Sequence, residues 1–126
     1  MNLRMAVPAD AEKILAWSEA NKGKSHFDAQ TLAYPLTEVL CAENGKATLF
    51  LPVQLVGMIE ALAPNPEASE VERKKALYLT LGALVRGARE QKVKELYFVG
   101  TDPELNAVAE SAGFEKLPWP VFRKRI

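Results

Sequence analysis

The stretch VKELYFVGTDPELNAVAESAGF, residues 93–114, decides the fold because several independent signals in it agree. Residues 96–99 are a short apolar and aromatic run, which at that length is typical of a strand buried on both faces. Asp102 can cap a following helix, and Pro103 suits a first helical position, where a missing N–H costs nothing. The closing Gly-Phe pair is a common helix stop. The stretch therefore predicts a strand, a turn and a short helix.

A longer helix is expected upstream of this stretch. An apolar run at 56–63 predicts a strand, which Pro64-Asn65-Pro66 ends, and Ser69 with Glu72 forms the capping-box pattern that opens a helix. Apolar residues then recur at helical spacing along one stripe, to about residue 91. Because this helix joins two short apolar strands, the sequence predicts a β-α-β unit with parallel pairing.

The first half of the chain predicts one helix and antiparallel strands. Residues 3–7 form a strand candidate, and Asp10 can cap a helix from Ala11 to about Asn21. The Asn-Gly pair at 44–45 is the strongest short hairpin signal, so two strands should flank it. A proline inside the return strand, 48–53, places that strand at a sheet edge or a bulge.

Length and composition restrict the class of protein. The 126 residues predict a single domain, 1–126, that buries roughly two-thirds of its unfolded surface. Lys plus Arg equals Asp plus Glu at 16 each, so neither nucleic acid nor a membrane is an expected partner. Cys41 is the only cysteine; it reads as a small buried hydrophobe, and with one histidine a metal site is not expected. Without a signal segment or an apolar run of about 20 residues, we expect a soluble, cytoplasmic protein.

In this order the elements resemble those of the Gcn5-related N-acetyltransferase (GNAT) superfamily. LRMAVPADAEKILAW resembles the family's first strand and helix, VLCAENGKATLFLPVQ its hairpin, and MIEALAPNPEA its fourth strand. The C-terminal strand, turn and helix ending in Gly-Phe resembles the family's last third, and FRKRI its closing strand, which we expect at 121–126. The resemblance covers nearly the whole chain. It implies an α/β fold of GNAT type, with a central mixed sheet flanked by helices.

The resemblance also implies an activity, the transfer of an acetyl group from acetyl-CoA to a small-molecule or peptide amine. Several GNAT enzymes carry a glutamate on the fourth strand as general base, a role that would fall to Glu60 here. The alternation of apolar and polar side chains along a half-exposed strand explains the presence of a glutamate at position 60 equally well. The backbone at Leu62 and Ala63 would pair with the pantetheine arm of the cofactor. Three residues after the first helix could face the acceptor: His26, Phe27 and Tyr34.

Two positions depart from the family pattern. Its pyrophosphate loop, R/Q-x-x-G-x-G/A, uses glycines and a helix N-terminus to bind phosphate, but residues 72–78 read ERKKALY. Arg73, Lys74 and Lys75 could offer charges to the phosphates instead, or belong to a solvated helix face. Ala109 stands where many members have a tyrosine that protonates the departing thiolate. These departures leave an alternative, a degenerate domain that binds or assembles without turnover. An edge strand could also pair two copies into a homodimer.

Overall fold

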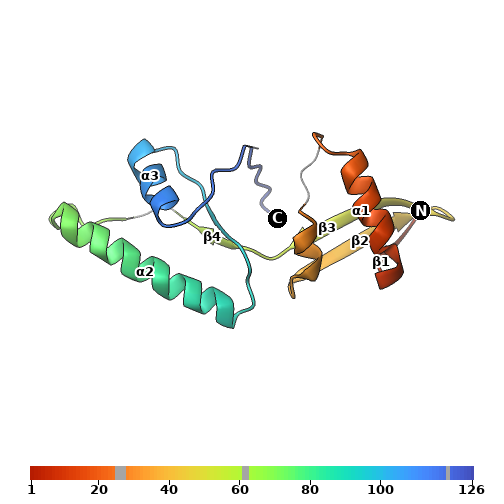
Figure 1. The fold of residues 1–126 in the computed structure, drawn as a ribbon, viewed down its shortest axis with the longest axis horizontal. Helices are drawn as coiled ribbons and strands as arrows, with labels where there is room; N and C mark the ends of the chain where they lie inside the picture. Colours follow the sequence, from red (N-terminus) through yellow and green to blue (C-terminus); the bar gives the residue numbers. More distant parts are fainter. Residues whose placement is uncertain (25–27, 61–62, 119) are drawn as a thin grey trace. The chain divides into compact units, whose positions relative to one another are not determined.

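The structure is a computed structural model, and it describes residues 1–24, 28–60, 63–118 and 120–126. Its elements follow the order β1 (Asn2–Met5), η1 (Pro8–Asp10), α1 (Ala11–Ala20), η2 (Ala29–Ala33), β2 (Thr37–Glu43), β3 (Ala47–Gln54), β4 (Gly57–Ile59), α2 (Glu70–Glu90), β5 (Leu96–Phe98) and α3 (Pro103–Ser111) (Figure 1). The chain is a mixed α/β protein, as the sequence predicts. Two compact units can be distinguished: the sheet unit (1–57 with 87–95) and the helix unit (58–86 with 96–126).

The sheet unit contains a three-stranded antiparallel sheet in the order β1-β2-β3. The predicted hairpin is confirmed: Gly45 has a φ of 71°, and the Asn44 N–H donates to the Lys46 carbonyl at 3.0 Å. A positive φ is cheap only for glycine, so the Asn-Gly pair sets the position of this turn and with it the register of both strands. The strand register shifts between Ala42 and Glu43, next to the turn. β3 lies at a sheet edge, as its proline predicts.

The core of the sheet unit lies between α1 and one face of this sheet. Cys41 on β2 is fully buried, which confirms its prediction as a small buried hydrophobe. Ile14 on α1 is 4% exposed, and Val39 on β2 is also buried. The ring of Trp17 on α1 packs against Phe50 on β3 with centroids 5.2 Å apart.

The helix unit contains α3, the larger part of α2 and most of the second sheet, which pairs β4 with β5. Both predicted caps form. The Asp102 carboxylate accepts from the N–H groups of Glu104 and Leu105 at the start of α3, and Ser69 pairs with Glu72 at the start of α2. The Gly-Phe stop is also confirmed, because Gly113 has a φ of 92° and the next N–H donates to the Ala109 carbonyl.

Three predictions about strands need correction. The described strands form two small sheets and not one central sheet. The reason lies in the hydrogen bonds after β3: the Leu55 N–H donates to the Leu36 carbonyl, whereas the Gly57 N–H donates to the Glu95 carbonyl. The strand expected at 56–63 is only Gly57–Ile59 within the described residues. Residues 121–126 are exposed and form no strand, so this cation-rich segment pairs with none of the described strands.

Candidate functional site

The candidate base, Glu60, directly follows β4 and is exposed. Its neighbour Ile59 lines an apolar cavity of the helix unit. An exposed carboxylate at a strand end is accessible to an incoming amine. The alternation of inward and outward side chains along a half-exposed strand also places a carboxylate in solvent. Its role as a base therefore stays a prediction.

The residues expected at the pantetheine arm and the acceptor are only partly described. Ala63 is exposed and lies outside any strand, and Tyr34 ends η2 and is half-buried. Leu62, His26 and Phe27 lie outside the described residues. The roles expected of these five positions stay predictions.

Arg73, Lys74 and Lys75 lie in the first two turns of α2, and all three are exposed. The ion pairs found in the described part of the chain involve none of them. Three cations on successive helix positions point in different directions, so they form a diffuse positive region and not a single pocket. Such charges can attract phosphate groups but cannot position them in the way that backbone N–H groups do.

The start of α2 is closed by its own residues. The Ser69 N–H and hydroxyl donate to the Glu72 carboxylate at 2.8 and 2.7 Å, and the Glu72 N–H donates to the Ser69 hydroxyl at 3.2 Å. The hydroxyl contact, followed by the backbone one, lowers the pKa of Glu72, so this helix start carries a carboxylate. A negative charge there opposes a phosphate. Residues 72–78 lie inside the helix and include no glycine, so this segment forms no phosphate loop.

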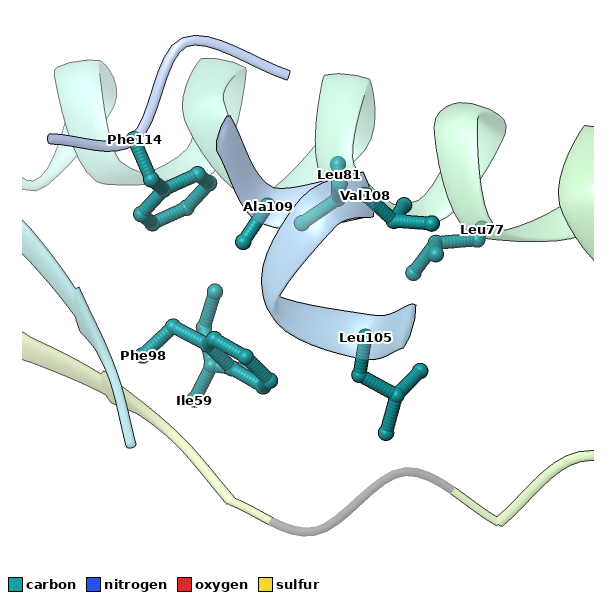
Figure 2. A pocket seen from close by; sticks show the side chains of 8 residues that line it. All are labelled: Ile59, Leu77, Leu81, Phe98, Leu105, Val108, Ala109 and Phe114. Carbon is teal, nitrogen blue, oxygen red and sulfur yellow. The ribbon is translucent and has the colours of Figure 1, made fainter. Parts of the chain in front are cut away.

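An apolar cavity of about 20 Å³ lies between α2, α3 and the strands β4 and β5 (Figure 2). Its lining side chains are all apolar: Ile59, Leu77, Leu81, Phe98, Leu105, Val108, Ala109 and Phe114. The cavity has space for about one water, and because no polar side chain lines it, it stays dry. It is a gap in the packing and is too small for a cofactor. Ala109 lines it and offers no hydroxyl. The nearby Tyr78 hydroxyl is hydrogen-bonded to Ser111 at 3.1 Å, which ties α2 to α3.

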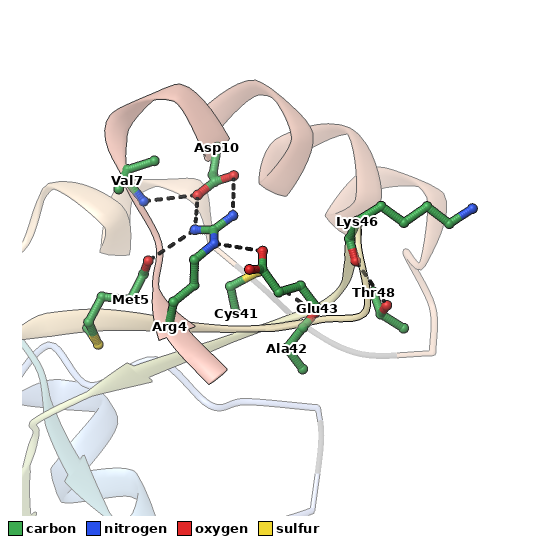
Figure 3. A network of polar contacts seen from close by, with 9 residues as sticks. All are labelled: Arg4, Met5, Val7, Asp10, Cys41, Ala42, Glu43, Lys46 and Thr48. Atoms are coloured by element: carbon green, nitrogen blue, oxygen red, sulfur yellow. Dashed lines mark hydrogen bonds and ion pairs between the residues drawn. The ribbon is translucent and has the colours of Figure 1, made fainter. Parts of the chain in front are cut away.

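A polar cluster that the sequence did not predict joins β1, η1 and β2 (Figure 3). Arg4 Nη1 donates to Asp10 Oδ2 at 2.7 Å, and Arg4 Nε donates to Glu43 Oε2 at 2.9 Å. The Val7 N–H also donates to Asp10, at 2.9 Å. The Arg4 contact, aided by Val7, lowers the pKa of Asp10 to about 2, and the two carboxylates raise the pKa of Arg4.

This cluster also corrects the prediction that Asp10 caps α1. Asp10 does hold the position before the helix, but its side chain makes no capping hydrogen bond. Its carboxylate turns to the guanidinium and to the N–H of Val7, because a charged, two-pronged donor binds a carboxylate more strongly than a helix N–H does. All its members are paired within the cluster, so its role is structural.

The comparison with solved structures gives a distant similarity. No family model and no curated protein matches the chain. A solved structure titled "Putative acetyltransferase from Agrobacterium tumefaciens str. C58" is similar over 99% of this chain and 100% of that chain, with a TM-score of 0.36 and 20% sequence identity. A TM-score this low assigns no activity. Among the described residues, no helix is long and apolar enough to cross a membrane. No group of three or more His, Cys, Asp or Glu side chains in those ranges could hold a metal ion.

Proposed function

We propose that the protein has a GNAT-like fold and transfers an acetyl group from acetyl-CoA to an amine. The order of its elements carries this proposal. A strand and helix, an antiparallel hairpin, a short strand, a long helix, a strand that pairs with the short one, and a capped helix follow each other as the resemblance predicts. Glu60 directly follows β4, and the resemblance expects a general base on that strand.

In the proposed reaction the acceptor nitrogen attacks the thioester carbonyl carbon. The C–N bond forms, the C–S bond breaks, and coenzyme A leaves as a thiolate. The proton that the amine loses passes to the Glu60 carboxylate, directly or through one water. With Ala109 in place of a tyrosine, the thiolate takes its proton from solvent. This lowers the rate without removing the reaction.

The cofactor's phosphates would rely on the charges of Arg73, Lys74 and Lys75, with the backbone at Leu62 and Ala63 pairing with the pantetheine arm. Exposed charges in water attract weakly and are screened by salt. The carboxylate of Glu72 at the start of α2 works against them. Binding of acetyl-CoA should therefore be weaker than with a glycine-rich phosphate loop and should fall as the salt concentration rises.

A thermal unfolding scan with and without millimolar acetyl-CoA tests the proposal without a choice of acceptor. Cofactor at about 100 times its Kd adds about 2.7 kcal/mol, which for a chain of this size raises Tm by roughly 8 to 12 °C. Replacing Arg73, Lys74 and Lys75 together with alanine should reduce the shift. The control variant Arg86→Ala/Arg89→Ala, which removes two cations further along the same helix, should leave the shift unchanged. Absence of any shift would sink the proposal.

Glu60→Gln tests the base separately. We expect amine acetylation to fall by about 10² to 10⁴ while the cofactor-induced Tm shift stays the same. Glu67→Gln, which neutralises another exposed carboxylate a few residues away, serves as the control and should leave turnover unchanged. Equal rates for wild type and Glu60→Gln would remove Glu60 from the mechanism.

The second candidate function is a binding or assembly module without turnover. Two observations favour it: the capping box that closes the start of α2 and the apolar surroundings of Ala109. This alternative predicts a folded protein with no Tm shift at any acetyl-CoA concentration and no acetylated product. The same scan therefore separates the two functions.

A further inference from the structure

We draw no further inference here: the strongest candidate, the apolar face of the three-stranded sheet that carries Leu40 and Leu51, supports no proposal, because nothing in the structure shows what covers it.

Discussion

In the sheet unit, strand register and ion pairs hold the buried residues in place, whereas in the helix unit half-exposed apolar side chains surround a small cavity. The buried residues in the described part of the chain all belong to the sheet unit: Asp10, Ile14, Val39 and Cys41. In the helix unit, Leu77, Leu81 and their neighbours remain only partly buried. Antiparallel strands with a defined hairpin turn bring distant residues into register, while two helices on a short sheet leave gaps between their side chains.

This difference indicates where each unit is easiest to disturb. Deep burial makes a truncated side chain costly, because the lost contacts leave a cavity. Partial burial makes the same truncation cheaper, and regions of this kind open locally at lower free energy. Changes in the sheet unit should therefore have larger effects than equivalent changes in the helix unit.

The largest effect is expected from Ile14→Ala. Ile14 is 4% exposed on α1, and truncation of a buried isoleucine costs about 2 to 5 kcal/mol. Leu81→Ala in the helix unit removes a half-buried side chain next to an existing cavity and should cost roughly half as much. Urea unfolding of the two variants measures both values. Equal losses would contradict the difference in packing between the units.

The polar cluster of the sheet unit predicts a pH dependence. The pKa of Asp10 is about 2 in the folded chain, below its ordinary value of 3.8. Because the folded value is the lower one, the stabilisation is fully present above about pH 4 and is lost as the pH falls toward 2. Asp10→Asn should lower the urea midpoint at pH 6 by less than Ile14→Ala does, because the cluster is only partly buried.

The midpoints of the wild type and Asp10→Asn should approach each other as the pH falls from 4 to 2. A constant difference between them over this range would show that the carboxylate's charge is not what holds Arg4. Arg4→Ala is the companion variant, since it removes the cause of the lowered pKa and should flatten the same pH profile.

A smaller loss is expected from the cap of α3. Asp102→Ala removes the carboxylate that accepts from the N–H groups of Glu104 and Leu105 and should cost about 1 kcal/mol. Asp102→Asn is the control, since an asparagine caps nearly as well. If both variants lose the same stability, the charge and not the hydrogen bond is what matters there.

The parts of the structure that the sequence predicts are those whose cause is local. Asp102 caps α3, Ser69 and Glu72 cap α2, and Gly45 forms the hairpin turn, because in each case the interacting groups lie within three residues of each other. Spacing and residue type are therefore enough to predict these caps and this turn. The buried position of Cys41 follows from its residue type within a strand.

The parts that the sequence misses depend on contacts between distant residues. The Arg4–Glu43 contact joins residues 39 positions apart, and no spacing rule relates them. The division into two sheets depends on where the chain finds partners after Gln54. The exposure of 121–126 likewise depends on pairing with another strand, and none of the described strands pairs with this segment. At the candidate site, Glu60 and Arg73 to Lys75 are exposed. Exposure fits a role in catalysis or phosphate binding, and it fits a solvated surface equally well. The acetyl-CoA binding experiment separates the two.

The smallest effect is expected from filling the cavity of the helix unit with Ala109→Val. Two added carbons would gain up to about 0.8 kcal/mol each if they fitted, but a cavity of about 20 Å³ has space for about one. A β-branched side chain in a helix costs up to about 0.7 kcal/mol, so the net gain should stay within about 0.5 kcal/mol, a small rise in Tm. Ala107→Val, exposed on the same helix, incurs the helix cost without the gain and should be slightly less stable than the wild type. If Ala109→Val is instead the less stable of the two, then the helix unit is already closely packed. The contrast between the two units would then rest on burial alone, since no free space would separate the side chains of α2 and α3.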